Sequence, residues 1–314
     1  MLVLARDGLT TILFHRFFFE GEALERGRDR LKRQCEWLRN HFSVLKLSGA
    51  TAALEANNLP PKSLLVTIDD AKVELLRVVD IFSSFELPVS IFACVGWCAR
   101  EAPDEGSLLA RVVERLEWYS GPNRTVATKL RELEVSSDAA LKRETIDFLL
   151  SHADELNADL EAVLQTVSDA VPVDRVSCSW DELTDLRALG AEIGGHSVSH
   201  VKLGAASTIR MKFEIAETGR ILREKFGSCD VFAYPYGMAG TYNEQTTREL
   251  KDSGFRFAFL THSDIATPQT SPFHLPRISM PDRPMIFPEF CLRAAGAGIV
   301  YRRLKQSGLI RSRN

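Results

Sequence analysis

The chain lacks an excess of charge of either sign, a long apolar run and the layout of a secretory signal. Its 314 residues include 39 basic and 42 acidic side chains. Nucleic-acid-binding proteins usually carry a basic excess, so we expect no nucleic-acid partner. No segment reaches the roughly 18 consecutive apolar residues of a membrane span. Arg6 and Asp7 interrupt the N-terminal apolar residues, and no basic region precedes them. We therefore expect a cytoplasmic protein.

Closely spaced cysteines are also few. Of the six cysteines, only Cys94 and Cys98 lie near each other, and no second pair completes a zinc knuckle. We predict six reduced thiols in the core. Hydrophobic residues make up 45% of the chain, which supplies enough apolar area to exclude intrinsic disorder.

Short apolar segments alternate with amphipathic ones along most of the chain. The predicted strands cover residues 9–14, 63–70, 87–94, 191–194, 231–234, 257–260 and 275–279. The predicted helices cover residues 24–42, 75–85, 180–189, 207–226 and 246–252. This alternation is typical of parallel βαβ units. Residues 101–178 show helical spacing alone, which predicts an α-helical insertion or cap.

The first chemically distinctive motif is Thr67-Ile68-Asp69-Asp70. The apolar strand before it is central, and its carboxyl end places two carboxylates together. Sites in α/β sheets and barrels form at that end of the strands. Alternatively, Asp70 caps the helix that follows.

The second motif is Gly194-Gly-His196-Ser-Val-Ser-His200, directly after a short predicted strand. If the segment is helical, His196 and His200 lie on one face, as paired metal ligands require. Two imidazoles and one carboxylate leave an open coordination position, which is the arrangement of a hydrolytic zinc site.

The third motif is Tyr234-Pro-Tyr236-Gly, at another strand end. Pro235 stiffens this loop, and the backbone N–H groups after it are suited to a developing oxyanion. Taken by itself, the segment also fits an aromatic turn with ordinary packing.

Together TIDDA, HSVSH and YPYG resemble the motifs of the polysaccharide deacetylases, also called NodB-homology proteins or family 4 carbohydrate esterases. The resemblance covers residues 9–100 and 180–282. It implies an α/β fold, a distorted (β/α)7-type barrel. It also implies that Asp69 is the general base, and that Asp70, His196 and His200 bind a divalent metal, for which we expect zinc. The backbone N–H of Tyr236 then stabilises the oxyanion.

The chain departs from the family pattern at three positions. Ala71 stands where the family has Gly, so a positive φ there would be strained. Ile68 replaces a Phe, which is a conservative change in a strand. Ala233 stands where the family commonly has the Arg that tethers the base. Arg277, on a later predicted strand, is the replacement that we expect, unless it is an ordinary surface residue.

In the common arrangement of this family, the general acid is the His of a Leu-x-His motif at the end of the last strand of the domain. Here the N-terminal strand ends in Leu13-Phe14-His15. This resembles the circularly permuted members that deacetylate biofilm polysaccharides. Because the first and last strands of a closed barrel are neighbours, we expect His15 to reach the rim that carries Asp69. His262, His274 and a purely structural His15 are the alternatives.

The expected activity is metal-dependent removal of an N-acetyl group from an amino-sugar-containing glycan or glycoconjugate. The alternatives are a deformylase or other amide hydrolase on a non-glycan substrate, and an inactive carbohydrate-binding relative. We expect residues 1–286 to form the barrel, with the cap and Phe17 to Phe19 shaping its groove. Residues 287–314 are expected to form an amphipathic, basic helical tail, which can contact an anionic membrane or pack on the barrel.

Overall fold

The computed structural model describes residues 8–19, 21–98 and 177–307. Almost all of the predicted insertion therefore lies outside the described residues. The strands are β1 (Thr10–Phe14), β2 (Ser43–Val44), β3 (Ser63–Asp69), β4 (Ser90–Ala93), β5 (Glu192–Gly195), β6 (Val231–Ala233), β7 (Phe257–Phe259) and β8 (Ile278–Ser279). They form one sheet in the order β7-β6-β5-β4-β3-β1-β8, and β2 pairs with β3. All of these pairings are parallel.

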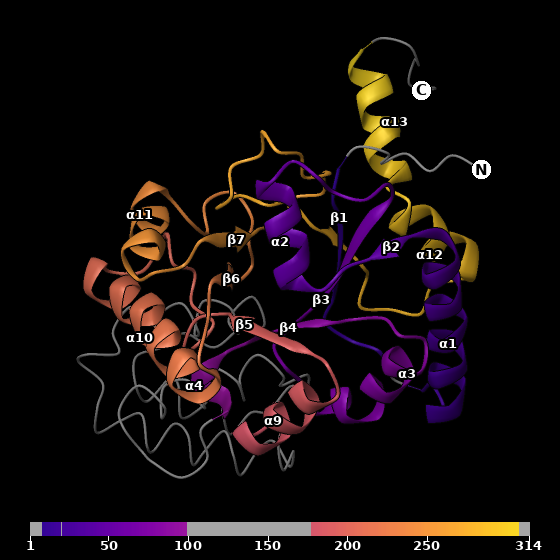
Figure 1. The fold of residues 1–314 in the computed structure, drawn as a ribbon, viewed down its shortest axis with the longest axis horizontal. Helices are drawn as coiled ribbons and strands as arrows, with labels where there is room; N and C mark the ends of the chain where they lie inside the picture. Colours follow the sequence, from indigo (N-terminus) through magenta and orange to yellow (C-terminus); the bar gives the residue numbers. More distant parts are fainter. Residues whose placement is uncertain (1–7, 20, 99–176, 308–314) are drawn as a thin grey trace, which may run out of the picture.

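The sheet curls into a distorted barrel of the predicted (β/α)7 type (Figure 1). The segment ending in β8 joins its two edges: Leu275 forms a parallel bridge with Phe259 of β7, while Ile278 pairs with Ile12 of β1. The N-terminal strand thus lies between β3 and the last strand, which is the neighbourhood that a permuted barrel requires.

Helices surround the sheet (Figure 1). They are α1 (Leu24–His41), α2 (Leu47–Glu55), α3 (Val79–Ser84), α4 (Val95–Cys98), α9 (Trp180–Ala188), α10 (Thr208–Phe226), α11 (Glu244–Asp252), α12 (Phe287–Ala294) and α13 (Ala297–Gln306), with the 3-10 helix η1 (Val73–Arg77). In α10, the Ser207 hydroxyl accepts the Arg210 N–H at the start, and Gly227 at φ 83° ends the helix. No helix among the described residues is long and apolar enough to cross a bilayer.

The alternating side chains of β3 separate two apolar clusters. Leu64, Val66 and Ile68 pack against the surrounding helices, whereas Leu65 belongs to a second cluster with Phe92 and other strand residues inside the barrel. Because successive side chains of a strand point to opposite faces, Asp69 shares the inner face with Leu65. The packing of this central strand thus directs a carboxylate into the barrel.

The elements differ from the sequence prediction in several places, and the short elements β2 and α4 were not predicted. The helix predicted over residues 75–85 is divided into η1 and α3, with the break at Val78. The helix α2 was not predicted. The His196–His200 segment is not a helix but a turn, in which Ser197 and His200 have φ values of 69° and 60°. All six cysteines are free, as predicted, but only five of them are buried, because Cys291 of α12 is partly exposed.

Candidate active site

The carboxyl ends of the parallel strands bring six of the seven predicted site residues, all except Arg277, to one cavity of about 190 Å³. Six strand ends or following loops contribute to it, those of β1, β3, β5, β6, β7 and β8. The lining residues are His15, Asp69, Asp70, Lys72, His196, His200, Tyr236, Thr261 and Asp282. Lys72, Thr261 and Asp282 were not predicted.

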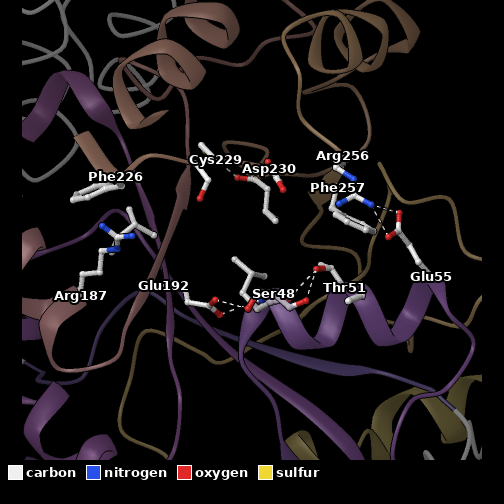
Figure 2. Close-up of a pocket in the computed structure, with 15 residues that line it drawn as sticks. Ser48, Thr51, Glu55, Arg187, Glu192, Phe226, Cys229, Asp230, Arg256 and Phe257 are labelled. Carbon is white, nitrogen blue, oxygen red and sulfur yellow. Dashed lines mark hydrogen bonds and ion pairs between the residues drawn. The ribbon is translucent and has the colours of Figure 1, made fainter. Parts of the chain in front are cut away.

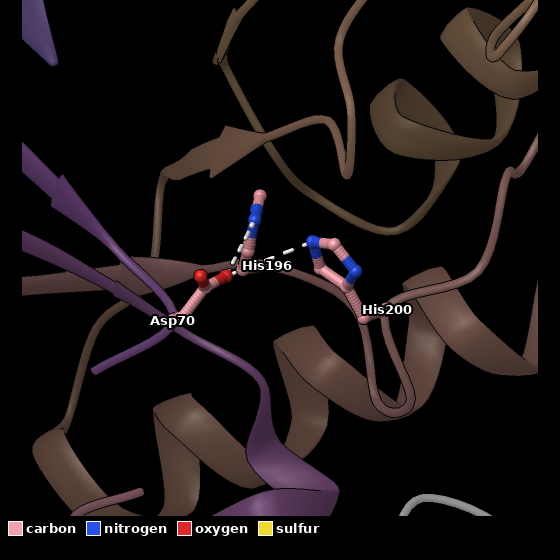
Figure 3. A group of neighbouring side chains, drawn as sticks. All are labelled: Asp70, His196 and His200. Carbon is pink, nitrogen blue, oxygen red and sulfur yellow. Dashed lines mark ion pairs between the residues drawn. The ribbon is translucent and has the colours of Figure 1, made fainter. Parts of the chain in front are cut away.

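Asp70, His196 and His200 converge as a metal site would require (Figure 3). One ligand atom from each lies within 4.8 Å of the others. The Nε2 atoms of both histidines are 3.6 Å from Asp70 Oδ1. Ligands of a tetrahedral zinc ion lie roughly 3.3 Å apart, so these separations leave room for a shared cation. All three side chains are buried.

Two further observations favour a cation. Asp70 Oδ1 is buried, and within the described part of the chain it accepts no hydrogen bond, although buried acceptors are normally satisfied. The other ring nitrogen of His196, Nδ1, lies 2.8 Å from the Ala233 carbonyl oxygen. Donation to that carbonyl leaves the Nε2 lone pair facing Asp70, the arrangement found in metal-ligating histidines. The donor set therefore fits a divalent ion.

The backbone around this group adopts unusual angles. Asp70 and Ala71 have φ values of 71° and 49°, and Tyr236 has a φ of 60°. Non-glycine residues occupy this region at a cost, and such strain concentrates at functional sites. The positive φ anticipated for Ala71 is therefore present, and the same strain extends to its neighbour Asp70.

A buried carboxylate of α10 holds the turn between the two histidines. Glu214 is fully buried and accepts the N–H groups of Val198 and Ser199 at 2.7 and 2.9 Å. It also accepts the Ser199 hydroxyl and forms an ion pair of 2.6 Å with Arg210. These bonds fix the chain between His196 and His200 in the absence of helical hydrogen bonds. Arg210 and Glu214 are spaced i, i+4 in an amphipathic helix, where such pairs are usually solvent-exposed, so the sequence did not mark them.

Arg277 pairs with Asp69 inside the barrel. Its Nη1 and Nη2 atoms lie 2.7 and 2.8 Å from the two Asp69 carboxylate oxygens, and its Nε donates to the Leu260 carbonyl at 2.8 Å. The guanidinium also lies over the rings of Phe92 and Phe259, at 5.6 and 6.0 Å. Arg277 is completely buried. It occupies the tethering position that Ala233 leaves vacant, and it is not a surface residue.

The charges around the site set its protonation states. Burial alone would raise the pKa of Asp69, but Arg277 together with His196 and His15 outweighs it, so the pKa is lowered. Burial opposes ionisation of Asp70 as well, and here Lys72 and the three site histidines together outweigh it, so the pKa of Asp70 is also lowered. Burial lowers the pKa of His196 to about 4. At neutral pH, both carboxylates are ionised and His196 is neutral, as ligation requires.

The structure distinguishes the three histidines considered as the general acid. His15 lines the cavity at the end of β1. His262 is exposed, and His274 lies against Tyr242, with a ring distance of 5.5 Å. Neither of them lines this cavity. Tyr236 forms part of the cavity wall, with its ring 4.7 Å from that of His200.

A second cavity, of about 250 Å³, lies at the other end of the strands (Figure 2). Glu192, Val231 and Phe257, the first residues of β5, β6 and β7, line it. Two groups of its polar residues are paired: Glu192 accepts the backbone N–H and hydroxyl of Ser48 at the start of α2, and Arg256 pairs with Glu55. In barrels of this kind that face contributes to stability, whereas catalysis occurs at the carboxyl ends.

Comparisons with known proteins agree with this fold. Residues 140–258 match the family model described as polysaccharide deacetylase, and this range includes the HSVSH and YPYG motifs. A search of curated proteins found no match. Among solved structures, IcaB from Ammonifex degensii is 18% identical with a TM-score of 0.58, covering 93% of this chain and 97% of that one.

Two further solved structures share the fold. The deacetylase PplD of Streptococcus pyogenes, in complex with acetate, is 14% identical with a TM-score of 0.60, covering 92% of this chain and 99% of that one. The BpsB deacetylase domain of Bordetella bronchiseptica is 12% identical with a TM-score of 0.54, covering 87% and 96%. This chain is therefore similar to the polysaccharide deacetylase family over residues 140–258, and it shares its fold with solved deacetylases.

Proposed function

We propose that this chain is a metal-dependent hydrolase that removes the N-acetyl group from an amino sugar within a glycan or glycoconjugate. The observation that carries the proposal is the Asp70, His196 and His200 group directly beside the buried Asp69–Arg277 pair. One set of side chains can hold a divalent ion while a separate carboxylate stays available to accept a proton. The two nitrogen donors and one oxygen donor suit zinc.

Each of the remaining site residues has a distinct task. A divalent ion held by the three ligands supplies Lewis acidity toward the acyl carbonyl and the attacking water. Asp69 accepts the proton of that water, and its lowered pKa keeps it ionised for this purpose. Arg277 orients Asp69 through both oxygens, and each carboxylate oxygen still has a lone pair for the proton.

The other half of the reaction falls to Tyr236 and His15. The Tyr236 backbone N–H donates to the oxyanion that develops from the carbonyl. His15 then delivers a proton to the departing amine nitrogen, because an amine anion is too basic to leave unprotonated. Both residues line the same cavity as Asp69.

The test is acetate release by the purified, zinc-loaded protein from N-acetylated sugars in free, nucleotide-linked, lipid-linked and oligomeric form. We expect turnover of at least one class and none by Asp69→Asn. A zinc-loaded protein that releases formate from formamides instead would favour the amide hydrolase alternative. Glycan binding without turnover would favour the inactive binding relative.

We also propose that α12 and α13 contact an anionic membrane surface. Tyr301 and Leu304 of α13 are 58% and 37% exposed. Residues 301–314 contain five basic side chains and no acidic one, a composition suited to anionic lipids. Removal of residues 301–314 should abolish co-sedimentation with phosphatidylserine vesicles but not neutral ones; equal binding by the truncated chain contradicts the proposal. The division into a barrel (1–286) and a tail (287–314), and the cytoplasmic location, stay predictions that limited proteolysis and cell fractionation test.

A further inference from the structure

Lys72 connects the metal-binding carboxylate to the strand end that carries His15. Its Nζ lies 3.3 Å from Asp70 Oδ2 and donates a hydrogen bond of 2.8 Å to the His15 carbonyl oxygen. The side chain lines the active-site cavity and is only 7% exposed. One ammonium group thus contacts two parts of the site that belong to different strands.

The backbone of Lys72 is itself fixed. It forms an antiparallel bridge with Ser177, and its carbonyl oxygen accepts the Leu75 N–H at 2.9 Å. The neighbouring Ala71 carbonyl accepts the Cys178 N–H at 2.8 Å. Because this backbone is anchored, the Lys72 ammonium group holds Asp70 Oδ2 and the His15 carbonyl oxygen at a fixed separation.

The residues after His15 are held by the 3-10 helix η1, which begins directly after Lys72. Glu74 of η1 accepts the Phe17 N–H at 3.0 Å and the Phe18 N–H at 3.4 Å. The parallel pairing of β1 with β3 ends at Phe14 and Ile68. The segments that follow these two strands are therefore not aligned by hydrogen bonds of that pairing. Lys72 and Glu74 replace the ladder at His15 and in the residues that follow it.

We propose that Lys72 is a positioning residue that sets the distance between His15 and the metal site. This inference rests on the proposed function, in which His15 protonates the leaving amine. Proton transfer requires the donor within hydrogen-bond reach of the nitrogen, and a displacement of about 1 Å can reduce a rate by roughly 10². Without the Lys72 contacts, the His15 carbonyl and Asp70 Oδ2 lose a shared partner, and His15 becomes free to shift.

The test compares Lys72→Met with Lys32→Met. Lys32 lies on α1 and is 47% exposed, so this control makes the same chemical change away from the site. We expect Lys72→Met to lower kcat for an N-acetyl amide about 10- to 100-fold. An activated ester, whose leaving group needs no proton, should lose less than about 3-fold. The double variant His15→Ala with Lys72→Met should be no slower on the amide than His15→Ala, because residues that act through one another are not additive.

A second readout needs no activity. In the metal-free protein, the imidazole NMR signals of His15 should move in Lys72→Met and stay in place in Lys32→Met. If Lys72→Met does not fold, Lys72→Gln takes its place. Unchanged amide turnover, or equal loss on amide and ester, overturns the inference. If the wild-type protein itself shows no amide turnover, the proposed function is refuted instead. In that case the NMR readout decides the positioning role, and unmoved His15 signals in Lys72→Met would overturn it.

Discussion

Replacing Arg277 by Met should destabilise the protein far more than the same change in an exposed arginine–carboxylate pair. Arg277 makes three hydrogen bonds of 2.7 to 2.8 Å, two of them to the Asp69 carboxylate, and no part of it reaches solvent. Its removal leaves the Asp69 charge buried without its partner. Breaking a buried pair in this way costs about 3 to 5 kcal/mol.

Arg256→Met is the matched control. Arg256 also contacts both oxygens of a carboxylate, that of Glu55, at 3.0 and 2.7 Å. Its side chain is 56% exposed, so water solvates the partner that remains, and a loss of about 0 to 1 kcal/mol is expected. Urea unfolding followed by circular dichroism measures both values. Adding Asp69→Asn to Arg277→Met should recover more than half of the loss, because the buried charge is then gone.

The loss in free energy of unfolding caused by Arg277→Met should also depend on pH. In the wild type, the pKa of Asp69 is below its unfolded value, so this residue stabilises the fold above a pH of about 3.9, and the effect is lost as the pH falls through the folded pKa. Without Arg277, burial raises the pKa, and Asp69 instead destabilises the fold at neutral pH. The difference between the two metal-free proteins should therefore be larger at pH 7 than at pH 3. A loss below 1 kcal/mol at pH 7, or a difference independent of pH, refutes this reasoning.

The sequence predicted the parts of the fold in which local patterns and burial agree. Strand β3 is a continuous apolar run that ends in two carboxylates, and both features are visible in the letters alone. Arg277 was predicted to pair with Asp69 because Ala233 stands where the family commonly has the Arg that tethers the base. The helix α2 was missed because its sequence, LSGATAALE, combines a Gly and a Thr with few large apolar residues, and its helicity depends on packing against β3.

The supporting residues could not be read from sequence, because their partners are far apart in the chain. Lys72 reaches the main chain 57 positions away, and Glu214 reaches a turn 15 to 16 positions before it. The sequence left open whether the His196–His200 segment is helical, and the structure has no helix there. Hydrogen bonds from Glu214 stabilise a turn with positive φ values that local propensity disfavours, and the two imidazoles converge nonetheless, with ring centroids 5.0 Å apart.

Three further predictions concern the site. Asp70→Ala, His196→Ala and His200→Ala should each abolish activity and lower the bound zinc, whereas Asp69→Asn should abolish activity and retain zinc. Elemental analysis measures the zinc content, and a zinc-free Asp69→Asn protein would reverse the assignment of base and ligand. His15→Ala should slow amide turnover by roughly 10² to 10⁴ and spare activated esters, with zinc content unchanged; if His262→Ala shows this loss instead, His15 is not the acid. Glu214→Gln should weaken zinc binding about 10- to 100-fold, the range typical of residues that orient metal ligands. The Gln amide group carries fewer acceptor sites than the carboxylate, so it cannot satisfy the Val198 and Ser199 donors together with Arg210. Glu217→Gln, on the same helix but paired with Arg220 at the surface, should leave the zinc dissociation constant unchanged. Equal zinc affinity in the two variants, measured by competition with a chromogenic chelator, would show that the turn holds its histidines without Glu214.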